Sequence, residues 1–64
     1  MCEFTVLVDG EKVAERVIKA MVKDDGTVVM SDIAGHMTRV EDARIRKVDT
    51  IMTELILERN GTSP

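Results

Sequence analysis

Apolar and polar side chains alternate near the start of this chain. In residues 2–8, Phe4, Val6 and Val8 fall on one face of an extended backbone, while the residues between them fall on the other. A period of two is the spacing of a β-strand that has one face toward a core. The pattern therefore predicts a strand at this position.

Turn signals divide the rest of the chain into short segments. Asp9-Gly10 and Asp25-Gly26 are dipeptides favoured in tight hairpin turns, because glycine, and to a lesser degree aspartate, tolerates a positive φ. A β-branched run at residues 27–30 follows the second turn directly. Leu55 and Leu57, enclosed by glutamates, repeat the alternation. We therefore predict further strands at residues 27–30 and 54–58.

Two longer segments have a pattern that fits either a helix or a strand. Val13, Val17 and Met21 recur every four residues, as on an amphipathic helix, yet residues 17–23 also alternate as in a strand. Residues 40–52 show the same dual character. Nine valines, five isoleucines and six threonines in 64 residues favour strands, because β-branched side chains pack well on a pleated surface. Periodicity alone leaves both assignments open.

The length of the chain limits its architecture. We interpret residues 1–59 as a single β domain and residues 60–64 as a flexible C-terminal tail. A domain of about 60 residues buries only ~60% of its unfolded surface and commonly needs a further source of stability. One cysteine excludes an internal disulfide. Self-association is the remaining general route, so we expect a homodimer.

Composition excludes several classes of protein. The chain is 44% hydrophobic and has a net charge of -3, so it is neither a disordered acidic tail nor a strongly basic nucleic-acid binder. No apolar run reaches the ~18–20 residues of a membrane span, and no signal peptide is recognisable. We therefore expect a cytoplasmic protein without a membrane partner. No nucleophile or carboxylate is tied to the single histidine by a recognisable motif, so we expect a non-enzyme.

Unusual ligand chemistry is concentrated at the N-terminus. Cys2 follows Met1 directly, so a thiolate lies within one residue of the Met1 α-amine, if Met1 is retained. The amine, the Cys2 amide nitrogen and the thiolate would close two fused five-membered rings in a plane. If Met1 is removed, Cys2 itself supplies an amine and thiolate chelate. Planar nitrogen and sulfur coordination suits Ni²⁺ or Cu²⁺, whereas Zn²⁺ prefers a tetrahedron. The alternative is that Cys2 is a buried, inert thiol.

Other candidate ligands are sparse. His36 follows Gly35 in an expected loop; it is either an additional metal ligand or an ordinary loop histidine. The five methionines are scattered along the chain, which is more typical of core packing than of a copper carrier. A zinc or thiol-redox role for Cys2 is a further alternative.

A basic group supports a different class of function, RNA binding. It consists of Arg39, Arg44, Arg46 and Lys47, which could contact phosphates. Single-stranded RNA readers usually stack bases on aromatic side chains, and this chain has one aromatic residue, Phe4, under a negative net charge. We therefore do not expect RNA as a partner, and keep RNA binding as the alternative.

The order of these features resembles one family. Met1-Cys2-Glu3-Phe4, then Asp9-Gly10, Asp25-Gly26-Thr27-Val28-Val29, Gly35, and Val48-Asp49 before a leucine-rich end look like the CooT family, from residue 1 to about residue 59. CooT proteins are small nickel-binding proteins associated with maturation of carbon monoxide dehydrogenase, and the wider family has also been labelled as RNA-binding. The resemblance implies a homodimer of mostly antiparallel β-domains that binds Ni²⁺ through Cys2. It also resolves both ambiguous segments as strands.

Together these observations define the expected protein. The expected fold is all-β, a small half-open antiparallel β-barrel of about six short strands. The expected function is binding of Ni²⁺, or of another divalent metal, through the Cys2 thiolate, with the site shared across the dimer. Delivery to a nickel enzyme such as carbon monoxide dehydrogenase is the role that the resemblance implies.

Overall fold

The computed structural model describes residues 2–61 and consists of strands joined by turns. The strands are β1 (Phe4–Val8), β2 (Glu11–Val22), β3 (Val28–Asp32), β4 (Met37–Val40), β5 (Ala43–Asp49) and β6 (Glu54–Arg59). The prediction of an all-β fold with six strands is therefore confirmed. Among the described residues there is no helix long and apolar enough to cross a membrane.

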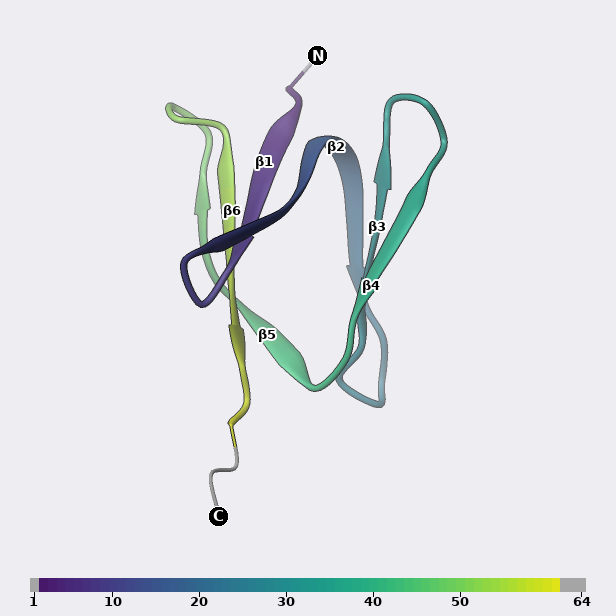
Figure 1. Cartoon of the computed structure of the whole chain (residues 1–64), viewed down its shortest axis with the longest axis vertical. Helices are drawn as coiled ribbons and strands as arrows, with labels where there is room; N and C mark the ends of the chain where they lie inside the picture. The colour runs from purple at the N-terminus through teal and green to yellow at the C-terminus, as the bar shows by residue number, and fades with distance from the viewer. Residues whose placement is uncertain (1, 62–64) are drawn as a thin grey trace.

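The strands form one six-stranded sheet in the order β4-β3-β2-β1-β6-β5 (Figure 1). Four of the five neighbouring pairs are antiparallel, but β1 and β6 are parallel, with Thr5 opposite Glu54 and Val8 opposite Leu57. The sheet is thus mixed and is not closed into a barrel, which corrects the prediction of a half-open antiparallel barrel. Alternation of side chains identifies a strand but carries no information about its direction, and a parallel partner requires a long excursion of the chain. Here the excursion is β2 to β5.

The ambiguous segment at residues 13–23 belongs to the long strand β2, which bends in its middle. Its first half pairs with β1 and its second half with β3, and Val17 takes part in both ladders. The bend coincides with Arg16, whose φ is 58°, a left-handed conformation that is uncommon for a residue other than glycine. Because of the bend, β2 forms one hairpin with β1 and another with β3.

The other ambiguous segment, residues 40–52, contains β5 and the turn that follows it. The strand interpretation is right for Ala43–Asp49, and the helical one is right for neither segment. Asp49 ends the strand, because its carboxylate accepts hydrogen bonds from the amides of Ile51 and Met52 at 3.0 and 2.9 Å. An aspartate that binds the backbone two and three residues ahead favours a turn over a continuing strand.

The hydrophobic core lies on one face of the sheet. In the ladders, Val6 is opposite Leu55 and Val8 is opposite Leu57, so these residues share one face. Phe4 and Ala14 pack against the core without being fully buried. The buried apolar residues are Val6, Val8, Val17, Val28, Met30, Val40, Ala43, Leu55 and Leu57. Of the methionines in the described residues only Met30 fills the core, so the prediction of methionines as core packing holds for one of them.

Hydrogen-bonded turns connect the strands at the end of the sheet opposite the N-terminus (Figure 1). Asp9 and Gly10 both have a positive φ, 50° and 88°, as a two-residue hairpin turn requires. Asn60 donates from its backbone amide to the Asp42 carbonyl at 2.8 Å and from Nδ2 to the Asp42 carboxylate at 3.0 Å. The hydrogen-bonded structure therefore continues to Asn60, while residues 62–64 of the predicted tail lie outside the described residues.

Candidate metal centre at the amino-terminal end

Cys2 lies two residues before the first residue of β1, at one end of the molecule (Figure 1). It is exposed and forms no disulfide, so the alternative that Cys2 is buried is wrong. The strand that follows is one of the two central strands of the sheet, between β2 and β6. The thiol is therefore accessible to solvent and is attached to a part of the fold that is paired on both sides.

Contacts to both neighbouring strands hold the residues that follow Cys2. The Thr5 amide donates to the Thr53 carbonyl at 2.9 Å, and Phe4 is opposite Val17 in the ladder with β2. Glu3 forms a long ion pair with Arg16, with 3.9 Å between the carboxylate oxygen and Nε. Both side chains are well exposed, so this pair adds little stability. The backbone bonds fix where the N-terminal segment leaves the sheet.

The side chains of one chain do not form a complete metal site. Among residues 2–61, no three histidine, cysteine, aspartate or glutamate side chains come together as metal ligands do. The Met1 amine lies outside the described residues. An ion at Cys2 would therefore need donors other than such a side-chain cluster: backbone nitrogen, water, or a second copy of the chain.

His36 lies in the turn between β3 and β4, at the same end of the molecule as the N-terminus (Figure 1). Asp32 organises this turn: its carboxylate accepts from the amides of Ala34 and His36, each at 2.9 Å. The Nδ1 atom of His36 is 3.4 Å from the other Asp32 oxygen, and the imidazole is 82% exposed. The pKa of Asp32 is lowered, chiefly by the bond from the His36 amide. The structure does not bring His36 together with Cys2 in a cluster of ligands.

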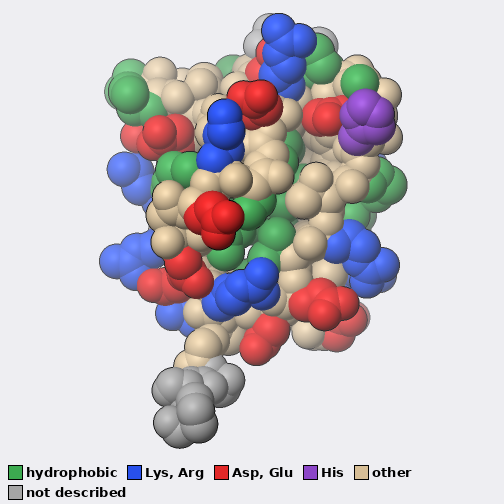
Figure 2. Space-filling model, in the orientation of Figure 1, with side chains coloured by type: hydrophobic (Ala, Val, Ile, Leu, Met, Phe, Trp, Pro, Cys, Tyr) green, Lys and Arg blue, Asp and Glu red, His purple; other side chains and the backbone are tan. Residues whose placement is uncertain are grey.

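The four basic residues are distributed over two strands and are partly neutralised. Arg44 Nη2 is 2.6 Å and Arg46 Nη1 is 3.3 Å from Glu58, so one carboxylate serves both arginines. Lys47 is 3.6 Å from Asp49, while Arg39 lies on β4. Figure 2 shows Lys and Arg interspersed with Asp and Glu on the face in view. These ion pairs weaken the argument for a phosphate-binding surface.

Sequence reasoning missed two features beside the N-terminal segment and β1. One is Arg16, because no glycine, asparagine or aspartate announces the bend that brings it beside Glu3. The other is the turn at residues 50–53, which presents Ile51 to solvent with 90% of its surface exposed. The signal for this turn was Asp49, whose pKa is lowered chiefly by the hydrogen bond from the Met52 amide. Both features adjoin the strand that carries the N-terminus.

Comparisons with known proteins agree on one family. Residues 1–58 match the model of the family described as CO dehydrogenase accessory protein CooT. A crystal structure assigned as CooT from Carboxydothermus hydrogenoformans superposes with a TM-score of 0.80 at 24% sequence identity, covering 91% of this chain and 97% of that one. A search of curated proteins gives no match. At this identity the structural similarity supports the fold, and the family match rests on the sequence.

Proposed function

The chain belongs to the CooT family of CO dehydrogenase accessory proteins, and from that premise we propose that it binds and delivers Ni²⁺. The Cys2 thiolate is the principal ligand. The observation that carries the proposal is an exposed, unbridged cysteine at the head of a central strand, in a chain with a family match that begins at residue 1. An exposed thiol can take up a metal ion and release it to a partner without local unfolding.

The geometry of a Met-Cys start favours nickel. Backbone nitrogen and thiolate of Cys2 close a five-membered chelate ring, and the Met1 amine, if Met1 is retained, closes a second ring in the same plane. Planar nitrogen and sulfur ligands are typical of Ni²⁺ and Cu²⁺, whereas Zn²⁺ prefers a tetrahedron. The absence of a side-chain cluster among residues 2–61 is consistent with a site built from backbone and thiolate.

The site is best completed by a second copy of the chain. One nitrogen and one sulfur from each copy would give a planar N₂S₂ set, so we propose a homodimer that binds one ion between two Cys2 residues. His36 is a candidate further donor. Asp32 lies next to its Nδ1 atom, and a carboxylate in this position orients a histidine so that Nε2 faces the metal.

A nickel titration tests this proposal. Reduced, tag-free protein should develop a saturable sulfur-to-nickel absorption band in the near ultraviolet, with one metal per dimer. Cys2→Ser should abolish the band, and the control Met37→Ser, which removes another exposed sulfur, should leave it intact. His36→Gln shows whether the imidazole contributes, because only a ligating histidine would change the band. A folded protein with no band would refute nickel binding at Cys2.

Delivery needs a separate measurement. We propose that the recipient is a nickel enzyme such as carbon monoxide dehydrogenase, in the cytoplasm. Nickel-loaded protein should activate nickel-free carbon monoxide dehydrogenase faster than an equal amount of nickel salt, whereas Cys2→Ser protein should give no advantage. Equal rates for the wild type and Cys2→Ser would refute a role in delivery while leaving metal binding intact.

A further inference from the structure

Arg16 occupies an irregular position in the sheet. Between the Phe4–Val17 pair and the next pair in the ladder, β1 advances by two residues but β2 by three, so β2 has an extra residue here. Such a β-bulge changes the direction in which a side chain leaves the strand. The φ of Arg16 is 58°, which a residue other than glycine adopts at a cost. The bend of β2 that contains the bulge lies toward the end of the molecule with the N-terminus (Figure 1).

The conformation of Arg16 is not explained by stability. The partner of its side chain is Glu3, with 3.9 Å between the carboxylate oxygen and Nε, and both side chains are well exposed. An exposed ion pair at this distance contributes less than a left-handed residue costs. A strained residue whose side chain adds little stability is a candidate for a functional role.

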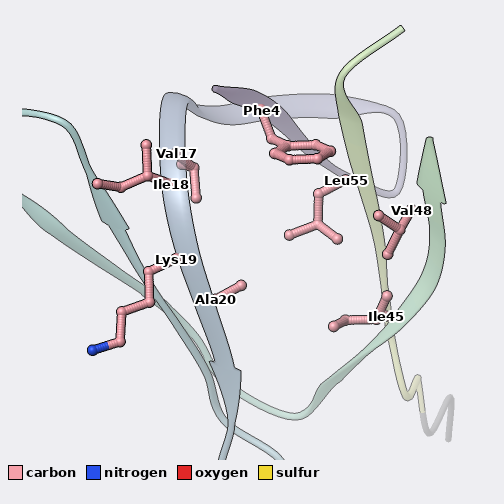
Figure 3. Close-up of a pocket in the computed structure, with 8 residues that line it drawn as sticks. All are labelled: Phe4, Val17, Ile18, Lys19, Ala20, Ile45, Val48 and Leu55. Atoms are coloured by element: carbon pink, nitrogen blue, oxygen red, sulfur yellow. The ribbon is translucent and has the colours of Figure 1, made fainter. Parts of the chain in front are cut away.

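The residues around Arg16 hold its backbone in place. Val17 is 3% exposed and lines an apolar pocket together with Phe4, its partner on β1 (Figure 3). The Arg16 carbonyl accepts a hydrogen bond from the Ile33 amide at 3.1 Å, at the start of the turn that joins β3 to β4. The bulge is therefore anchored to the core on one side and to the β3–β4 turn on the other.

We propose that this bulge places the positive charge of Arg16 beside Cys2, where it favours a metal centre built from anionic ligands. The inference rests on the proposed function in one respect, namely that the Cys2 thiolate binds the metal. Glu3 directly follows Cys2, so its carboxylate, unless it is offset, repels an anionic donor at this end of the molecule. Arg16 is thus a positioning residue, which acts through its charge on the ligands and does not contact the metal.

The charge balance of the proposed centre explains why a cation favours it. Two thiolates already neutralise Ni²⁺, each deprotonated amide ligand adds a negative charge, and Glu3 of each copy adds another. Arg16 contacts Glu3, and successive Cα atoms are ~3.8 Å apart, so the guanidinium lies on the order of 10 Å from the thiol. At ~10 Å, one unit charge changes a binding constant ~2-fold at a dielectric constant of ~80, and by more at lower values.

The test measures the charge near the thiol without any metal. Cys2 is the single cysteine of the chain, so every thiol reaction of the reduced protein reports on it. Initial rates are compared for the dianionic disulfide dithiobis(nitrobenzoate) and the uncharged dithiodipyridine. The same thiolate attacks both reagents, so the ratio of the two rates cancels changes in thiol reactivity and reports the local charge.

The variants separate charge from structure. At ~0.01 M salt, where the Debye length is ~30 Å, Arg16→Gln should lower the ratio about threefold or more. Arg16→Lys, which keeps the charge, should lower it much less. Arg16→Gly, which removes the charge and the strain together, should lower it as Arg16→Gln does. The control Lys19→Gln removes a charge from the same strand, but the Lys19 side chain points away from Phe4 (Figure 3), so the ratio should stay that of the wild type.

Salt and nickel complete the test. At ~1 M salt, where the Debye length is ~3 Å, the ratios of all variants should converge, whereas a structural effect of the substitution would persist. Equal ratios for the wild type and Arg16→Gln at low salt would overturn the inference. In a nickel titration at low salt, the affinity of Arg16→Gln should fall about twofold or more, and that of Lys19→Gln should not change.

Two combined outcomes separate this inference from the proposed function. A rate ratio that falls in Arg16→Gln without any change in nickel affinity would overturn the role of Arg16 at the metal centre and leave nickel binding intact. A wild type that binds no nickel, together with a rate ratio that falls in Arg16→Gln, would refute the proposed function and leave the placement of the charge standing.

Discussion

Leu57→Ala should remove a large part of the stability of this domain. Leu57 is 1% exposed and lies in the middle of β6, where Val8 of β1 is opposite it on one side and Ile45 of β5 on the other. The substitution removes three carbon atoms from the core, worth about 2.4 kcal/mol at ~0.8 kcal/mol per buried methylene. Two backbone ladders hold the neighbours in place, so the cavity collapses little and the cost rises toward ~3 kcal/mol, within the measured range for Leu→Ala.

This loss in the free energy of unfolding is large relative to the total stability of the domain. A domain of 64 residues has roughly 3–10 kcal/mol of stability at ~0.05–0.15 kcal/mol per residue. Urea unfolding followed by far-ultraviolet circular dichroism, at one fixed protein concentration, measures the change. With a slope of ~1 kcal/mol/M for a small protein, the midpoint should fall by about 3 M if the slope is unchanged.

Ile56→Ala is the matched control. Ile56 is the adjacent residue on the same strand, but it is on the opposite face of the sheet, where it is opposite Leu7 and Lys47 and only partly buried. Its cost should stay near ~1 kcal/mol, the span of strand propensity in a host protein. If the two variants lose equal stability, the assignment of the core to the face that carries Leu57 is refuted.

Three further changes test the backbone and the charges. Arg16→Gly should leave the free energy of unfolding nearly unchanged, because relief of ~1–3 kcal/mol of strain at φ 58° offsets the entropy of glycine. The control Lys19→Gly, in the same strand, should lose ~0.5–1 kcal/mol. Equal losses of stability in urea unfolding would contradict strain at Arg16. Gly26→Ala should cost ~1–2 kcal/mol of stability, because φ at this position is 86°. The cost comes from the backbone and not from a clash, since the nearest atoms to an added Cβ are 4.0 Å away. An unchanged thermal unfolding midpoint would show that the turn adapts. Backbone amides lower the pKa values of Asp25, Asp32 and Asp49, chiefly the amides of Thr27, His36 and Met52 respectively. Because these pKa values are lower in the folded chain than their usual 3.8, the stability they contribute is complete above that pH and is lost as pH falls through the folded values. The triple Asp→Asn variant should therefore show a flatter loss of stability below about pH 4, and an unchanged acid profile would contradict this.

The sequence pattern was sufficient to predict β1, β3 and β6, but it left β2 and β5 open and did not predict the arrangement of the strands. Alternation identified β1 and β6, since Val6, Val8, Leu55 and Leu57 are indeed the buried residues of these strands. The parallel pairing of β1 with β6 depends on contacts between residues about 50 positions apart, and no local pattern encodes such a pairing. The bend at Arg16 was equally hidden, because it depends on contacts with residues distant in sequence, among them the bond from the Ile33 amide to the Arg16 carbonyl.

The features of the candidate site also depend in part on contacts that no local pattern predicts. The exposure of Cys2 could not be predicted, since a cysteine at the start of a strand is often buried. The sequence shows the basic group, but it does not show that Arg44 and Arg46 pair with Glu58. Glu58 lies 14 and 12 residues from these arginines and contacts them only because β5 and β6 are neighbours in the sheet. The number of basic residues in this group therefore overestimates the positive charge that is available to bind a phosphate.

The fold fixes where the proposed metal site lies. The proposed ligand precedes β1, and that strand is hydrogen-bonded to β2 on one side and to β6 on the other, so the point where the N-terminus leaves the sheet is fixed. The ligands themselves need no cluster of side chains, because a chelate of backbone nitrogen and thiolate has its geometry set by covalent bonds. In the proposed homodimer, the second copy of the chain supplies the other such chelate.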